Sequence, residues 1–362
     1  MLILGINVFH ADTSAVFVKD GKIAYAAEEE RFARIKHFSG FPINAISEGL
    51  KFLGLKSTDI DLVTMNYDLK YNFKEKVLFT LKNLHKTYVY SKLLSLKSRS
   101  SIDEIFLSQF KTKKEIKFLQ IPHHKCHIAS SYLASGFKKS IGYSYDASGD
   151  FSTIESYILD NNSFTLLNKV NYPHSLGILY QMITQYLGFK NYGDEYKVMG
   201  LQSFGKASLK NEILKLIKKA NGKNFKLNLN YFTHSNENLS FEFANNKPTF
   251  PDLFSDKIFE LLGPSRKINE KLTKHHMNIA ASLQVVFEDV VFEQLNYLYD
   301  KYKIDNLCMA GGCAFNSVLN GKIKKRTGFK DIYIHSNAGD AGGALGAALI
   351  ASSENDQNFK NV

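Results

Sequence analysis

The strongest constraint on the fold is a repeated unit of strand, polar turn and strand. The first copy opens the chain with LILGINV, HADTS and AVFVKDG, and a further strand follows in KIAYAA. The second copy is SIGYSYDASGDFSTIESYILDNNS. Short β-branched and aromatic runs broken by Asp, Ser and Gly are hairpin signals. Two copies predict a duplicated α/β protein with two lobes, whose polar turns face each other across a nucleotide-sized cleft.

A His-x-x-x-His pair precedes the second copy, in the stretch HHKCHIASSYLASGF. If this stretch is helical, His123 and His127 lie four residues apart on one face, so both imidazoles can bind one metal ion. Asp146, in the turn that follows, offers an oxygen ligand. His124 lies off the shared face, and we expect it to be structural or exposed. Such a pair is a weak signal by itself, because surface helices carry histidine pairs by chance.

Two glycine-rich turns follow short strands near the end of the chain. NIAASLQVVFEDVVFEQLNYLY has the apolar spacing of a core helix. NLCMAGGCAFNSVLNGKI then predicts a buried strand, a Gly-Gly turn and a helix, an arrangement that lets the backbone approach a phosphate. DIYIHSNAGDAGGALGAALIA repeats this order with a helix of small residues, which permits close packing.

The remaining segments are placed around this frame. INAISEGLKFLGL predicts an amphipathic helix, residues 74–97 a basic helix or helices, and NYGDEYKVMGLQSFGK a loop. We place the first lobe at residues 1–135 and the second at residues 136–362. We expect the second lobe to carry a peripheral insertion near residues 206–265. We also expect its final helix to pack back against the body of the protein.

Composition limits the binding partners and the cellular compartment that we expect for this protein. The formal charge of +11 comes largely from a basic segment between Lys70 and Lys117, which we interpret as a solvated face because no nucleic-acid module accompanies it. We therefore expect no nucleic-acid partner. Three cysteines lack the spacing of a disulfide framework, and no apolar run reaches the roughly 20 residues of a membrane span. The expectation is a soluble, cytoplasmic protein.

The motifs taken together resemble the N-terminal domain of the nodulation and antibiotic O-carbamoyltransferase family. The resemblance covers residue 2 to about 350 in family order, through HADTSA, EEERFARIKH, HHKCHIASSYLASGF, YDASGD, HSLGILYQMIT, GDEYKVMGLQSFG, NIAASLQ, MAGGCAFN and NAGDAGGALGAA. That domain is similar to the tRNA threonylcarbamoyltransferase TsaD. The resemblance therefore implies the duplicated, two-lobed, actin-like and sugar-kinase-like ATPase (ASKHA) fold.

The resemblance also implies a metal site made by His123, His127, Asp146 and Asp340. Iron is the metal that the family implies, and zinc is the alternative, because two imidazoles with carboxylate oxygens suit either ion. Asp340 has a simpler interpretation as the cap of the following helix.

The implied chemistry has two steps. Carbamoyl phosphate and ATP give carbamoyl-adenylate, and the carbamoyl group then passes to a hydroxyl of a sugar or other small-molecule acceptor. His10, in the first hairpin, is the candidate general base. Its alternative role is that of a hydrogen-bonded hairpin residue.

The resemblance implies a nucleotide site as well. Gly311, Gly312 and Asn316 would hold the adenylate, although the glycines alone could merely close a tight turn. Glu195 and Lys197 match a family segment that faces the nucleotide, and their alternative is an exposed ion pair.

Two departures from the family pattern affect the functional hypothesis. Asp146-Ala147-Ser148-Gly149 stands where the family commonly has Asp-Gly-x-Gly. The chain also lacks the second, YrdC-like domain that makes the adenylate, so we expect a separate chain to supply it or a split or truncated gene product. The alternatives are a TsaD-like tRNA-modifying enzyme and a non-catalytic nucleotide-binding remnant. Against the former, His123-His124-Lys125-Cys126-His127 replaces the His-x-Glu-Gly-His form.

Overall fold

The computed structural model describes residues 1–83, 101–112, 116–235 and 242–355. The first of its two large sheets is built from the N-terminal strands, in the order β3-β2-β1-β4-β5. Strands β1, β2 and β3 pair antiparallel, whereas β4 and β5 run parallel to β1. The five strands are β1 (Leu2–Asn7), β2 (Ser14–Lys19), β3 (Lys22–Glu28), β4 (Leu62–Met65) and β5 (Lys117–Gln120).

The second sheet repeats this order as β8-β7-β6-β13-β14. Its first three strands are antiparallel, and β13 and β14 run parallel to β6. The strands are β6 (Lys139–Gly149), β7 (Ser152–Asp160), β8 (Ser163–Asn171), β13 (Asn306–Ala310) and β14 (Asp331–Ile334). The same order and the same strand directions confirm the predicted duplication and the actin-like, sugar-kinase-like fold.

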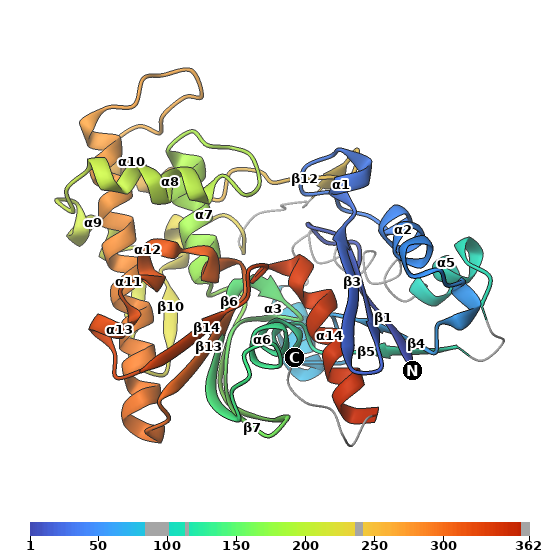
Figure 1. Ribbon diagram of the computed structural model, residues 1–362. Coiled ribbons are helices and arrows are strands. Elements are labelled where there is room, and N and C mark those ends of the chain that lie inside the picture. Colours follow the sequence, from blue (N-terminus) through green and yellow to red (C-terminus); the bar gives the residue numbers. More distant parts are fainter. Residues whose placement is uncertain (84–100, 113–115, 236–241, 356–362) are drawn as a thin grey trace.

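Two helices lie between the sheets and share a core with both. They are α6 (His123–Tyr132) and α14 (Asp340–Asn355), and α14 packs against α6, β1 and β2 (Figure 1). This core joins side chains of the first sheet, such as Ile3 and Val16, to Tyr157 and Leu159 of the second. Close approach is possible because small residues line α14: a Cβ on Gly346 would lie 1.8 Å from the Cys126 carbonyl oxygen.

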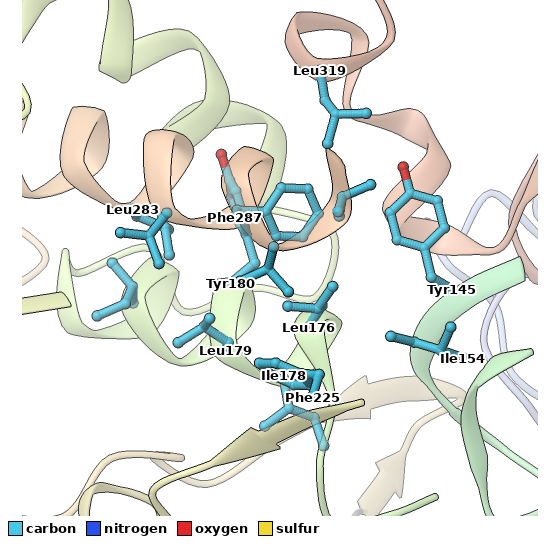
Figure 2. Packing of buried hydrophobic residues seen from close by; sticks show 14 of the residues in the cluster. Tyr145, Ile154, Leu176, Ile178, Leu179, Tyr180, Phe225, Leu283, Phe287 and Leu319 are labelled. Carbon is cyan, nitrogen blue, oxygen red and sulfur yellow. The ribbon is translucent and has the colours of Figure 1, made fainter. Parts of the chain in front are cut away.

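The other helices cover the outer faces. The long α11 (Lys274–Tyr302) begins at a Thr273 cap, and its apolar side chains pack with α7 (Leu176–Tyr186), as Figure 2 shows for Leu283, Phe287 and Leu179. The remaining helices are α1 (Glu30–Ala33), α2 (Ile43–Leu53), α3 (Phe73–Lys82), α5 (Ile102–Gln109), α8 (Glu195–Leu201), α9 (Lys210–Leu214), α10 (Ile258–Leu262), α12 (Ser317–Asn320) and α13 (Ile323–Arg326).

The structure contradicts one prediction and describes only part of the segment to which another applies. The stretch NYGDEYKVMGLQSFGK was expected to be a loop, but it contains α8, whose Val198 and Leu201 are buried. Glycines at both ends hid this short helix from the pattern. Of the basic helical segment expected over residues 74–97, α3 is described, and residues 84–100 lie outside the described part of the chain.

The segment near residues 206–265 forms short elements, and Phe225, Phe232 and Leu253 of this segment belong to the core that α7 and α11 share. Two small antiparallel sheets occur here, from β9 (Ile217–Ala220) with β10 (Phe225–Leu227) and β11 (Glu242–Ala244) with β12 (Lys247–Thr249). Within the described residues, no helix combines the length and apolar character that a bilayer crossing requires.

Candidate metal centre and adjoining cavity

Four side chains from three elements meet between the lobes. His123 and His127 stand on the first turns of α6, Asp146 lies near the end of β6, and Asp340 is the first residue of α14. Their ligating atoms all lie within 4.8 Å of one another. The structure thus brings together the four residues that the sequence analysis named as metal ligands.

The two imidazoles point at each other and at both carboxylates. The Nε2 atoms of His123 and His127 are 2.9 Å apart, and each lies 3.4 Å from Asp340 Oδ1. Asp146 Oδ2 lies 3.1 Å from His127 Nε2 and 4.0 Å from His123 Nε2. Donors bound tetrahedrally at about 2.1 Å from an ion are separated by roughly 3.4 Å, so the set fits a divalent metal.

The chemistry of the donor set agrees with its geometry. Asp340 Oδ1 is buried and, within the described part of the chain, accepts no hydrogen bond of normal geometry. A buried carboxylate oxygen without a partner is costly, and a cation among these four residues would satisfy it. Two nitrogen and two oxygen ligands suit Fe(II) and zinc equally.

Burial and charge act in opposite directions on these groups. Burial opposes protonation of His123, but contacts with Asp146 and Asp340 raise its pKa to about 10. Burial and the Asp340 charge oppose ionisation of Asp146, yet His123 and His127 hold its pKa well below the usual range. Without a metal, the two ionised carboxylates thus favour protonated histidines, and a bound cation would take the place of those protons.

His124 lies outside the cluster although it is buried. Its Nδ1 is 2.7 Å from Ser144 Oγ, on another face of α6. Burial, with the charges of His123 and His127, lowers its pKa to about 3, so it is a neutral structural residue. Of the two roles expected for His124, the exposed one is excluded.

His10 contacts the second oxygen of the Asp340 carboxylate. His10 Nδ1 lies 2.7 Å from Asp340 Oδ2, and its ring centroid is 5.9 Å from that of His123. Asp340 thus faces the two histidines of α6 with one oxygen and His10 with the other. A carboxylate this close to Nδ1 favours the tautomer protonated there, in which Nε2 is the proton acceptor.

A cavity of about 440 Å³ adjoins the cluster and is lined from both lobes. Asp146 and Asp340 form part of its wall, together with three predicted nucleotide residues, Gly312, Asn316 and Glu195. Lys197 is not among the described lining residues, and its ammonium instead pairs with Asp194 Oδ1 at 2.7 Å. The ion pair that Lys197 makes is thus with the neighbouring Asp194 and not with Glu195.

The Gly-Gly turn after β13 requires glycine for a steric reason. Gly311 has a φ of 93°, and a Cβ there would lie 2.2 Å from the Tyr145 carbonyl oxygen. The N–H of Gly312 donates to Asp146 Oδ2 at 3.1 Å, so the turn holds a cluster carboxylate. Asn316 caps α12 by accepting from the Leu319 N–H at 3.0 Å.

Burial also sets the charge of Glu195 in this cavity. It raises the pKa of the carboxyl to about 7, far above that of a solvated glutamate. An acid in this range exchanges its proton near neutral pH.

Sequence reasoning missed a second histidine–carboxylate pair on the cavity wall. Asp12 and His37 both line the cavity, and their Oδ1 and Nδ1 atoms lie 2.7 Å apart. Burial lowers the pKa of His37, but the hydrogen bond and charge of Asp12 outweigh it, and the net shift is upward. The motifs HADTSA and EEERFARIKH contain these residues, but their spacing in sequence gives no sign of the contact.

Tyr180 and Gln284 were missed too. Tyr180 lines the cavity, and its hydroxyl donates to Gln284 Oε1 at 3.0 Å. Gln284 belongs to a segment interpreted only as a core helix, and Tyr180 to a motif used only for the family resemblance. Gln284 also contacts Asn316, so it links α7 and α11 to the start of α12.

Known proteins resemble the chain over nearly its whole length. The family model described as Carbamoyltransferase N-terminus matches residues 2–349. The uncharacterized protein sll1178 of Synechocystis is 35% identical over 99% of this chain and 58% of its own. Nodulation protein NolNO of Sinorhizobium fredii is 29% identical over 97% of this chain and 48% of its own. The chain thus spans about half the length of these relatives.

A more distant relative carries a different activity in its name. The tRNA N6-adenosine threonylcarbamoyltransferase of Malacoplasma penetrans is 22% identical over 92% of this chain and 93% of its own.

Proposed function

This chain belongs to the carbamoyltransferase family, and from that premise we propose that its cleft transfers a carbamoyl group from carbamoyl-adenylate to a hydroxyl of a small acceptor. The observation that carries the proposal is the cluster of His123, His127, Asp146 and Asp340 beside a cavity that both lobes line. The acceptor class is a sugar or a secondary metabolite. This assignment rests on the breadth of the family, since the cavity does not identify one compound.

The cluster would hold iron, with zinc as the alternative. A divalent ion bound there supplies Lewis-acid chemistry, which polarises a carbonyl and stabilises charge on its oxygen. The protein's own contribution is the buried donor set, in which the Gly312 N–H orients Asp146 and the His10 imidazole orients Asp340. Such second contacts fix ligand geometry and are costly to remove.

His10 is the proposed general base of the transfer step. The acceptor oxygen attacks the carbamoyl carbon, and the bond from that carbon to the adenylate phosphate oxygen breaks. The bonding electron pair leaves with AMP, and the hydroxyl proton passes to His10 Nε2. Asp340, at 2.7 Å from His10 Nδ1, stabilises the resulting imidazolium.

The nucleotide part of the donor would occupy the cavity. Gly312, Asn316 and Glu195 lie on its wall, and apolar residues such as Phe287 complete it. We propose that a YrdC-like activity makes the adenylate from ATP and carbamoyl phosphate.

The test is carbamoyl transfer from preformed carbamoyl-adenylate, with iron-loaded and zinc-loaded protein compared. Products of candidate sugar and metabolite acceptors are detected by mass spectrometry. His10→Asn keeps an amide nitrogen near Asp340 but removes the proton acceptor, so kcat should fall about 100-fold to 10,000-fold with metal content unchanged. Metal-dependent transfer that survives this substitution would contradict the base assignment.

A second candidate is tRNA modification, which the near full-length match to the Malacoplasma protein favours. It predicts threonylcarbamoyl-adenosine formation when the gene complements a deficient strain. A chain that binds nucleotide and metal but transfers to neither class of acceptor would instead be a non-catalytic remnant.

A further inference from the structure

The helix α3 packs on the second lobe with one of its faces. The Phe79 ring lies edge-on to the rings of Phe151 and Tyr172, with centroids 5.3 and 5.5 Å apart. One turn earlier, Glu75 Oε1 pairs with Lys169 Nζ at 3.1 Å. These contacts fix the rotation of the helix about its axis, so the residues on its opposite face point away from the protein.

The outward face of α3 is largely apolar. Phe73, Leu78 and Leu81 are 64%, 57% and 60% exposed, and Val77 is 39% exposed. Their spacing of three and four residues makes them neighbours on the helix surface. Within the described residues, no other helix exposes more than two large apolar side chains. The face is therefore a patch, unlike the single exposed apolar residues that soluble proteins commonly carry.

Lysines stand beside this apolar patch. Lys74 and Lys82 are exposed positions of α3, and Lys70 is exposed in the turn before it. Glu75 is the acidic residue of α3, and its carboxylate is already paired with Lys169 on the other face. The outward face thus combines apolar side chains with unneutralised positive charge.

This combination distinguishes between three kinds of partner. A second copy bound about a two-fold axis would place lysines against lysines, because such a contact pairs a surface with itself. A nucleic acid would offer phosphates to the lysines but would leave the apolar side chains in water. A bilayer with anionic headgroups complements both features, because long lysine stems let the ammonium groups reach phosphates while apolar side chains enter the acyl boundary.

We propose that α3 binds the surface of an anionic phospholipid membrane, with its axis in the plane of the headgroups. The apolar side chains of its outward face enter the interface, and the three lysines contact lipid phosphates. A helix bound in this way lies on the bilayer and does not cross it. The inference goes beyond the proposed function and does not depend on it, since none of the described residues that line the cavity belongs to α3.

Flotation of the full chain with phospholipid vesicles, at a series of lipid concentrations, tests the proposal. Phosphatidylcholine vesicles that contain about one-third phosphatidylglycerol are compared with vesicles of phosphatidylcholine alone. One lysine near an anionic surface increases affinity about 5-fold, so three predict a preference of about 100-fold for the anionic vesicles. Added salt should reduce this preference by screening. Equal binding to both kinds of vesicle, or binding to neither, overturns the proposal.

The apolar patch is tested by the triple variant Phe73→Gln, Leu78→Gln and Leu81→Gln. Its affinity for the anionic vesicles should fall at least about 10-fold, because three apolar side chains no longer enter the interface. These side chains are exposed in the free protein, and glutamine is a good helix former, so the melting temperature should stay near that of the parent protein. A variant that floats as the parent protein does overturns the proposal.

The matched control changes one phenylalanine and two leucines on other helices. Phe52 of α2, Leu107 of α5 and Leu214 of α9 are 73%, 49% and 41% exposed. Glutamine at all three positions should leave vesicle binding unchanged. An equal fall in both triple variants would make exposed apolar surface in general responsible, and would overturn the assignment to α3.

A lysine variant separates the membrane from the other partners. Lys70→Gln, Lys74→Gln and Lys82→Gln together should remove most of the preference for anionic vesicles. A variant that keeps the full preference overturns the proposal. Dimerisation in analytical ultracentrifugation, or binding of a single-stranded RNA, that the α3 variants abolish in a protein that does not float would overturn it in favour of that partner.

Discussion

At the scale of single residues, the four clustered side chains should bind metal as a unit. His127→Ala removes one imidazole and leaves the carboxylates of Asp146 and Asp340 facing each other with less positive charge. Metal affinity should fall more than roughly 100-fold, because even outer contacts of a ligand are worth 10-fold to 100-fold. Metal content after dialysis, measured by mass spectrometry, checks this expectation.

His124→Asn is the control for that substitution. An asparagine nitrogen can replace His124 Nδ1 at Ser144, and the residue lies outside the cluster. Full metal content is expected. Metal bound equally well by His127→Ala would show that the cluster is not the site.

A single half-buried carboxyl should also govern part of the pH dependence of stability. Burial raises the pKa of Glu195 to about 7 from 4.5. The folded state therefore binds this proton more tightly, and its contribution to stability is present below pH 4.5 and is lost as pH rises to 7. Glu195→Gln should be stabilised relative to the parent protein above pH 7, by at most about 3 kcal/mol.

Melting temperatures between pH 5 and pH 8 measure this difference. The gap between Glu195→Gln and the parent protein should widen as pH rises. Glu293→Gln, at an exposed position of α11, is the control and should show a gap that does not change with pH. A gap for Glu195→Gln that stays constant would contradict the assignment.

At the scale of elements, the contact between α6 and α14 depends on a glycine, because a side chain at that position would not fit. A Cβ at Gly346 would lie 1.8 Å from the Cys126 carbonyl oxygen, so Gly346→Ala should force the helices apart. We expect a loss of about 1–3 kcal/mol, as for other overpacked cores. Urea unfolding measures it.

Gly200→Ala is the control, and we expect it to change the free energy of unfolding in the opposite direction in the same urea assay. Gly200 lies in α8, where a Cβ would meet no atom within 4 Å. Alanine should stabilise this helix by up to about 1 kcal/mol. If both substitutions had the same sign, close packing of α14 would not be the reason for its glycines.

At the scale of the whole molecule, the two lobes should unfold together. Ile3 and Val16 of the first sheet share one core with Tyr157 and Leu159 of the second, through α6 and α14. Calorimetry should show a single transition. Residues 1–135 and 136–362 produced separately should fail to fold, because the first would lack α14. Two separate transitions would show independent lobes.

Local patterns in the sequence were sufficient to predict many of the strands and helices. Short β-branched and aromatic runs predicted β1, β2 and β3, and helical spacing predicted α2 and α11, because both signals are carried by neighbouring residues. The exception is α8, which is too short for its period to be visible between glycines. The duplication itself was readable because the same pattern occurs twice.

What the sequence determined by itself is therefore the set of elements, their repeat and the types of residue that can bind a metal. Only the tertiary structure decided that Asp340 meets His123 and His127, that Asp12 meets His37, and that Lys197 pairs with Asp194. These contacts join distant positions, so they depend on how sheets and helices pack. A pattern of neighbouring residues carries periodicity, whereas a site is made by long-range contacts that periodicity does not encode.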